Sequence, residues 1–275
     1  MTNNPLQKLF RNKSYYLELP SKGAHYPSGI TLSVDNELGI MPMTIRDEII
    51  LKSPDVLFNG EALYELFRSC VPDIVNPKEI PQCDIDSILI GIRMAGGKKN
   101  IEISSTCPSC SEPAEYELSL GTMLNSVASI STETTITLED NTVVEVRPYS
   151  LETQVKAKVQ EFHQHRMQQI LIADNIDEEA KTKAFDEAMA ASSLIQIAMV
   201  AGNIIRVTPD DEESVTSPEF ILGWVQNMNK ETYKAIIAKI IELSNGEMDN
   251  TFTVTCDKCQ HEYKTSVDIN PVNFF

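Results

Sequence analysis

Ile101-Glu-Ile-Ser-Ser-Thr-Cys-Pro-Ser-Cys110 and Thr251-Phe-Thr-Val-Thr-Cys-Asp-Lys-Cys259 are the two stretches that decide how this chain folds. Each is a short strand-like run that ends in a Cys-x-x-Cys pair. A polar turn and a second alternating run follow each pair, at Ala114–Leu120 and at Glu262–Asp268. Alternation with a period of two predicts strands, so both segments are predicted to be copies of one unit: strand, tight turn, strand.

The cysteines of the two turns, Cys107, Cys110, Cys256 and Cys259, have the composition of a tetrahedral metal site. One Cys-x-x-Cys turn presents two sulfurs, and a second turn completes the four thiolates of a structural zinc site. The spacing departs from that of an ordinary zinc ribbon, because 145 residues separate Cys110 from Cys256. We therefore expect one structural Zn²⁺ ion that ties the middle of the chain to its C-terminal part.

The sequence supports other uses of the cysteines less well than this site. A redox pair of the thioredoxin kind needs a Cys-x-x-Cys that opens a helix after a buried strand, whereas both pairs here lie between polar β-like runs. His261 could replace one thiolate, although four cysteines already satisfy the ion. Cys70 and Cys83 have no Cys-x-x-Cys partner, and a reducing compartment disfavours a disulfide between them.

The composition is that of a globular protein, with 42% hydrophobic and 23% charged residues in 275, which is long enough for about two domains. A net charge of −17 repels nucleic-acid phosphates. The sequence contains no apolar run of transmembrane length, and Met1-Thr-Asn-Asn-Pro5 lacks the apolar core of a signal peptide. We expect folding in a cytoplasm, no membrane span and no nucleic-acid binding.

The order of predicted elements indicates an α+β fold in four parts. Residues 1–13 are expected to form a flexible basic arm, and residues 14–100 a small β-rich module with short helices. Residues 101–148 and 247–275 are expected to form a zinc-ribbon-like β module, in which residues 133–138 and 143–146 form a hairpin. A helical insertion, residues 149–246, interrupts this module and is expected to contain two long helices in an antiparallel hairpin. The first is expected from Leu151 to about Ala173 and the second from about Asp177 to Val200. The second is expected to carry one apolar stripe, made of Phe185, Met189, Ser192, Ile195 and Met199.

Local signals predict where several elements begin and end. Alternation predicts a strand at 30–34, beside strands at 15–19 and 38–42. Thr44 is expected to cap a helix, with Asp47 in the capping-box position. Asp84 is expected to cap another helix, which carries an apolar stripe from Ile85 to Ile92.

Catalytic motifs are absent from the sequence: it has no Gly-rich phosphate loop, no His-Glu-x-x-His and no Gly-x-Ser-x-Gly. Carboxylates are abundant, but none lies in an apolar setting that would mark it as a general acid or base. We therefore expect neither an enzyme nor a small-molecule substrate.

Tyrosines near the N-terminus suggest a surface for a protein partner, because tyrosine combines a large contact area with a polar tip. The candidate partner-binding residues are Tyr16, Leu19, Pro20, Lys22 and Tyr26. The alternative is that these are core and turn residues of the β module.

A series of short motifs in the N-terminal part adds a resemblance to a known family. The motifs are Tyr16-Leu-Glu-Leu-Pro-Ser-Lys-Gly23, Tyr26-Pro27, Met41-Pro-Met-Thr-Ile-Arg-Asp-Glu48, Lys52-Ser-Pro-Asp-Val-Leu-Phe-Asn-Gly60, Cys70-Val-Pro-Asp73, Asp84-Ile-Asp-Ser-Ile-Leu-Ile90, Arg93 and Cys107-Pro-Ser-Cys110. The series resembles a baseplate protein family of T-even-type contractile-tailed bacteriophages, over about residues 14–120.

The resemblance implies a structural or assembly role in a contractile tail baseplate, as a hub component or a hub assembly protein. It implies that other hub and tail proteins are the partners, and that the protein is found in the virion baseplate or in the host cytoplasm during assembly. An assembly chaperone absent from the virion is an alternative. A zinc ribbon that binds nucleic acid through Lys98, Lys99, Lys258 and Lys264 is another, which the acidic background opposes.

Overall fold

The computed structural model falls into two compact units, Met1–Ile130 with Gly246–Phe275 and Ser131–Asn245. Helices and small antiparallel sheets make up both, which confirms the expected α+β class. The residues that the structure describes are 6, 9–52, 60–127, 130–131, 133–172, 192–210, 212–246, 250–267, 269 and 274.

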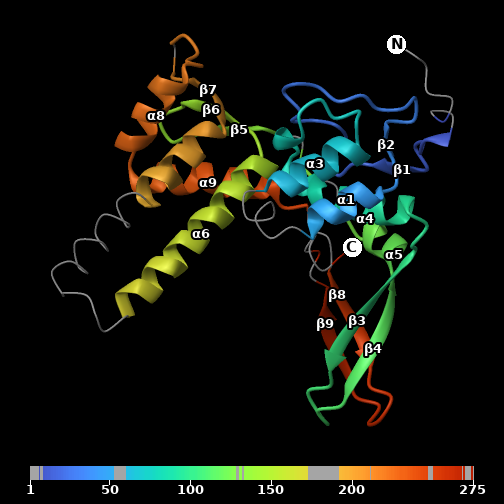
Figure 1. Ribbon diagram of the computed structural model, residues 1–275. Coiled ribbons are helices and arrows are strands. Elements are labelled where there is room, and N and C mark those ends of the chain that lie inside the picture. Colours follow the sequence, from blue (N-terminus) through green and yellow to red (C-terminus); the bar gives the residue numbers. More distant parts are fainter. Residues whose placement is uncertain are drawn as a thin grey trace. The chain divides into compact units, whose positions relative to one another are not determined.

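The N-terminal part of the first unit is a two-stranded antiparallel sheet with helices packed on it (Figure 1). Helix α4 lies against this sheet at Gly91, where an added Cβ would be 2.4 Å from Cδ1 of Ile40. A side chain larger than hydrogen at this position would therefore force the buried Ile40 side chain to move. The elements are β1 (Tyr15–Glu18), β2 (Glu37–Ile40), α1 (Ile45–Leu51), α3 (Glu61–Cys70), η2 (Pro77–Glu79) and α4 (Gln82–Ala95).

The predicted capping box is present at the start of α1. The backbone N–H of Asp47 donates to the Thr44 hydroxyl, and the Asp47 carboxylate accepts from the Thr44 backbone N–H at 2.7 Å. The prediction for Asp84 is wrong, because α4 begins at Gln82 with Pro81 as its N-cap. Asp84 lies within the first turn and is buried, and its carboxylate accepts hydrogen bonds from other parts of the unit.

The strand expected at residues 30–34 is wrong. Only an isolated bridge forms there, between Ile30 and Ile74. The physical reason is a turn: Asn36 adopts a φ of 61°, its backbone N–H donates to the Ser33 carbonyl, and the chain reverses into β2. Residues 33–36 are therefore unavailable for a continuous strand.

The base of the expected flexible arm is held by polar contacts. Arg11 forms an ion pair with Asp47 at 3.3 Å and donates to the Ser69 carbonyl at 2.8 Å. Lys13 forms an ion pair with Asp73. The chain is therefore fixed at residues 11–13, directly before β1.

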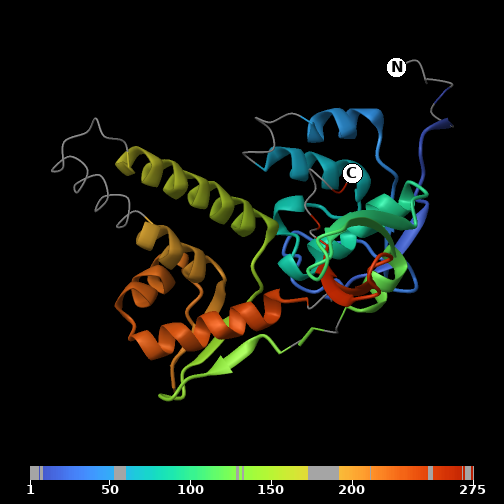
Figure 2. The same cartoon turned by 90° about the horizontal axis from the view of Figure 1, so that it is seen from below.

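Two antiparallel hairpins complete the first unit. One contains β3 (Asn100–Thr106) and β4 (Pro113–Ser119), and the other contains β8 (Thr251–Thr255) and β9 (Glu262–Ser266). The hairpins lie side by side in both views (Figures 1 and 2). The short helix α5 (Leu120–Asn125) follows β4 directly.

The second unit contains a three-stranded antiparallel sheet of order β5-β6-β7, with helices packed against it. Its buried core joins Val144 and Val146 of β6 to Ile204 and Val207 of β7, and to Ile221, Val225, Ile236, Ile240 and Leu243 of the helices. The elements are β5 (Thr135–Thr137), β6 (Val143–Val146), α6 (Leu151–Ile172), β7 (Ile204–Thr208), α8 (Pro218–Asn227) and α9 (Lys230–Ser244).

The unit boundary differs from the one expected at residues 148 and 149. The hairpin of β5 and β6 was expected in the zinc-ribbon-like module, but β6 pairs with β7 along its other edge. Strand β7 is not among the strands that the sequence predicts. Since Val144 and Val207 are adjacent in this pairing and both buried, the hairpin belongs with the helices of residues 131–245.

The two long helices of the expected insertion are described only in part. Helix α6 spans Leu151–Ile172, close to the predicted limits of 151 and 173. Most of the second helix, expected at 177–200, lies outside the described residues, and residues 192–202 are helical. Ser192 is buried as expected, whereas Ile195 is exposed. The predicted stripe residues Phe185 and Met189 lie outside the described residues.

Candidate metal centre

The two hairpins bring together the four cysteines that the sequence singled out. The sulfurs of Cys107, Cys110, Cys256 and Cys259 all lie within 4.8 Å of one another. Across the hairpins, the Sγ atoms of Cys107 and Cys259 are 3.7 Å apart, and those of Cys110 and Cys256 are 3.6 Å apart. These distances place four donor atoms close enough to bind one metal ion.

The two cysteine turns have the same backbone conformation. In the first turn the Ser111 N–H donates to the Cys107 carbonyl at 2.9 Å, and in the second the Gln260 N–H donates to the Cys256 carbonyl at 2.8 Å. Ser111 and Gln260 adopt φ angles of 56° and 57°. This left-handed backbone closes each turn so that its two sulfurs point the same way. The predicted repeat of one unit is therefore present in three dimensions.

Cys256 and Cys110 have shifted pKa values. The backbone N–H groups of Cys259 and Lys258 donate to the Cys256 sulfur. They lower the pKa of Cys256 to about 7, and Cys259 has the larger effect. At Cys110 the Glu112 N–H acts in the same direction, but the neighbouring sulfurs of Cys259, Cys256 and Cys107, together with burial, raise the pKa of Cys110 to about 12. Four sulfurs this close cannot all ionise without a cation among them.

The donor set fits a tetrahedral ion bound by four thiolates. Zn–S bonds of about 2.3 Å imply sulfur–sulfur distances of ~3.8 Å in a regular tetrahedron, close to the two measured cross-hairpin distances. Cys107 and Cys256 are buried, whereas Cys259 is exposed. A site with four protein ligands has no open position for a substrate, so a metal bound here would serve the structure.

Side chains outside the sulfur cluster also join the hairpins. Lys258 of the second turn forms an ion pair with Glu112 of the first, and this contact raises the pKa of Lys258. The Tyr116 hydroxyl donates to the Thr255 carbonyl at 3.3 Å, and the Tyr263 hydroxyl donates to the Tyr116 oxygen at 3.3 Å. Sequence reasoning missed these contacts, although both tyrosines alternate with exposed residues in the predicted strands.

The remaining cysteines lie outside the cluster as free, buried thiols. Burial raises the pKa of Cys70 to about 12 and also raises the pKa of Cys83. His261 is exposed and stacks on Tyr263, with ring centroids 6.4 Å apart. The thiols of Cys70 and Cys83 are therefore protonated at neutral pH. Among the described residues, the donor atoms of the metal site are cysteine sulfurs alone.

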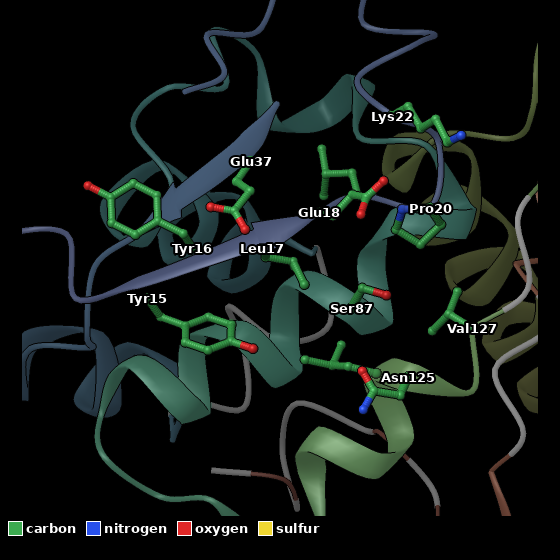
Figure 3. A pocket seen from close by; sticks show the side chains of 12 residues that line it. Tyr15, Tyr16, Leu17, Glu18, Pro20, Lys22, Glu37, Ser87, Asn125 and Val127 are labelled. Carbon is green, nitrogen blue, oxygen red and sulfur yellow. The ribbon is translucent and has the colours of Figure 1, made fainter. Parts of the chain in front are cut away.

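The predicted partner-binding residues divide into an exposed and a buried set. Tyr16, Leu19, Pro20 and Lys22 line a groove of about 360 Å³ beside β1 (Figure 3). Within it Tyr16 is 49% exposed and Leu19 is buried. Tyr26 is buried and does not line the groove. Some of these residues are therefore exposed, as a partner surface requires, and others are buried, as the alternative of core and turn residues requires.

Asp84 connects the groove-lining loop to α4, a role that the sequence analysis did not find. The backbone N–H of Ser21 and the hydroxyl of Tyr26 donate to its carboxylate, both at 2.8 Å. Burial raises the pKa of Asp84, although these hydrogen bonds act against the shift. The available signal is the position of Asp84 directly before the apolar stripe of a helix, which also predicts a helix cap.

The fold and the sulfur cluster define the class: an α+β protein with four thiols arranged as in structural metal centres. The sequence model of a protein family described as "T4 bacteriophage base plate protein" matches residues 13–275. The chain belongs to this family, as the motifs of its N-terminal part suggested. Comparison with curated proteins found no match, and comparison with solved structures found none.

Family membership makes the chain a structural protein of the phage tail baseplate that binds other baseplate proteins. Proteins of such a structural family are generally not enzymes. Among the helices in the described part of the chain, none is both long enough and apolar enough to cross a membrane.

Proposed function

We propose that this protein is a hub component or a hub assembly factor of a contractile tail baseplate, and that it acts by binding other baseplate proteins. The observation that carries the proposal is the family match over nearly the whole chain, residues 13–275. The protein would offer binding surfaces on a folded scaffold, and we expect no catalytic activity and no small-molecule substrate.

Zinc is the proposed metal, held by Cys107, Cys110, Cys256 and Cys259. The support is the all-sulfur donor set and the sulfur–sulfur distances of 3.6 and 3.7 Å. A bound Zn²⁺ ion would supply a cross-link between the two hairpins. Because these hairpins flank the segment Ser131–Asn245 in the sequence, the cross-link would hold together the two parts of the chain that the insertion separates.

The proposed partner surface lies around the groove beside β1. Tyr16, Pro20 and Lys22 would contact the partner, because they line the groove and are at least partly exposed. Leu19 and Tyr26 would act from beneath, by fixing the loop that carries Pro20 and Lys22. The strong acidity of the chain suits basic partners.

Quantitative mass spectrometry of gradient-purified virions tests the role in the tail. A hub component is expected at a fixed, low ratio to the other baseplate proteins, both in virions and in isolated baseplates. An assembly factor is expected in infected-cell lysates and in baseplate precursors, but not in virions. Absence from virions, precursors and isolated baseplates alike would refute both forms of the proposal.

Metal analysis by plasma mass spectrometry tests the zinc site, on protein purified without chelator. We expect about one zinc ion per chain, in line with a single four-thiolate site. The double variant Cys107→Ser/Cys256→Ser is expected to contain none. Cys70→Ala is the matched control, because it removes a buried thiol outside the cluster. Equal zinc in wild type and double variant, or a metal-free wild type, would refute the zinc proposal.

A further inference from the structure

The groove beside β1 has three features that the fold of its own chain leaves unused. The first is the strand edge: β1 pairs with β2, and the other strands in the described part of the chain pair elsewhere. An open edge presents backbone N–H and C=O groups that can pair with an added strand. Residues of β1 line the groove, as do Leu124 and Val127. Figure 3 shows Val127 across from the strand.

The second feature is a buried hydroxyl without a partner. Ser87 of α4 is 1% exposed, lines the groove, and its Oγ atom has no hydrogen-bond partner among the residues that the structure describes. Buried polar groups are nearly always hydrogen-bonded, and an unmade hydrogen bond costs about 1–3 kcal/mol. A polar group entering the groove would satisfy this hydroxyl.

The third feature is a pair of acidic side chains. Glu18 and Glu37 lie directly opposite each other in the β1–β2 register, and both line the groove. Like charges at this position destabilise a sheet. The ion pairs found among the described residues leave both carboxylates without a cation. Lys22 lines the same groove but forms none of these pairs. The groove therefore suits a basic, extended segment.

The N-terminal arm has the matching chemistry. Its base is fixed by the ion pairs of Arg11 and Lys13. Just before this base, the neighbouring apolar side chains of Leu9 and Phe10 are 72% and 59% exposed, and are therefore free to contact a partner. Lys8 adds a positive charge. Five extended residues span ~17 Å, enough to cover a four-residue strand edge of ~13 Å.

We propose that the groove beside β1 binds the N-terminal arm of a second copy of this chain, as an added strand on the open edge. Lys8 of the arm forms ion pairs with Glu18 and Glu37. Leu9 and Phe10 contact the apolar side chains of Leu124 and Val127. A backbone group of the arm forms a hydrogen bond with the Ser87 hydroxyl. The inference rests on the proposed protein-binding role of this surface and names its occupant.

Sedimentation of the full-length chain over a range of concentrations tests the proposal. Wild type is expected to self-associate, and more weakly as salt rises, because the charges involved are close to the surface. Glu18→Lys and Lys8→Glu are each expected to weaken association about tenfold or more. A mixture of the two variants should restore it, because the Lys8→Glu arm then meets the Glu18→Lys groove. Glu213→Lys, an exposed change of the same charge, is the control.

Two further variants separate docking from folding. Ser87→Ala is expected to leave the melting temperature unchanged or raised, since the hydroxyl has no partner within the chain, and to weaken association several-fold. Leu9→Ser/Phe10→Ser should abolish association without loss of stability, since both side chains are exposed.

A chain that stays monomeric at high concentration, or a charge-swapped mixture that fails to associate, would overturn the proposal. Capture of a basic segment from a different baseplate protein in the same groove would overturn it too. The role in the baseplate would survive each of these results, because virion composition tests it separately.

Discussion

Two residues that directly follow the cysteine pairs adopt a conformation that their side chains do not favour. Ser111 and Gln260 have φ angles of 56° and 57°, in the left-handed region that glycine occupies freely. Left-handed backbone costs a non-glycine residue roughly 1–2 kcal/mol. The two turns form nonetheless, which indicates that the hairpins and the sulfur cluster impose the conformation.

Glycine is therefore expected to be tolerated at these positions, whereas a β-branched residue is expected to destabilise the turn. Ser111→Gly should change the free energy of unfolding by less than about 1 kcal/mol, because relief of strain offsets the added freedom of the unfolded chain. Ser111→Val should destabilise by about 1–2 kcal/mol and weaken zinc binding. Urea denaturation and metal competition measure both effects, and equal stability of the two variants would contradict the argument.

Asp84 provides a second test on single residues. Asp84→Ala leaves the donors of Ser21 and Tyr26 unpaired in a buried place, and we expect a loss of about 2–4 kcal/mol in the free energy of unfolding. Tyr26→Phe should cost less, because the backbone N–H and the hydroxyl of Ser21 still donate to Asp84. In a double-mutant cycle by urea denaturation, the two changes should be clearly non-additive. Additive effects would show that the hydrogen bond contributes little.

At the level of elements, α4 organises the first unit. Its residues include Asp84, which fixes the loop; Ser87, which faces the groove; and Gly91, which contacts the sheet. Arg93, near its end, donates to the carbonyl of Phe274, which is buried near the C-terminus. One helix thus contacts the groove beside β1, the first sheet and Phe274.

The close approach of α4 to the sheet predicts a pair of compensating changes. Gly91→Ala places a Cβ 2.4 Å from Cδ1 of Ile40, and overpacking of this kind costs about 1–3 kcal/mol. Ile40→Val removes that Cδ1 atom at a cost of about 0.5–1.5 kcal/mol. The double variant should be more stable than the sum of the two losses predicts. Simple additivity in thermal or urea unfolding would contradict the packing argument.

At the scale of the whole molecule, the two units have separate means of stabilisation. The segment Ser131–Asn245 has an apolar core built from its sheet and helices. The hairpins of the first unit alternate exposed and half-buried residues along β3, β4, β8 and β9, and few of their side chains are fully buried. A metal cross-link therefore matters more for the hairpins than for the inserted segment.

Removal of the metal should consequently act on one unit. After chelation we expect amide hydrogens of β3, β4, β8 and β9 to exchange faster by an order of magnitude or more, because binding energy at such a site is folding energy. Protection in β6, β7 and α9 should be unchanged. Hydrogen exchange with mass spectrometry measures both, and the Cys70→Ala variant controls for general thiol loss. Uniform loss of protection in both units would contradict this division.

Several features could be predicted because their signals are local. The hairpins around Cys107 and Cys256, the capping box of Thr44 and Asp47, and the pairing of β5 with β6 depend on residues a few positions apart. Alternation, turn chemistry and capping preferences act at that range. The family resemblance also rested on short contiguous motifs, and the match to residues 13–275 agrees with it.

The fold class and the paired cysteine turns could thus be predicted from the amino-acid pattern, and the resemblance of short motifs already indicated the family. Only the tertiary structure decided that β6 pairs with β7, that Asp84 binds Ser21 and Tyr26, and that Ser87 faces a groove beside an open strand edge. These features join residues about 60 positions or more apart. Such contacts depend on how whole elements pack, and no propensity of a single segment encodes that packing.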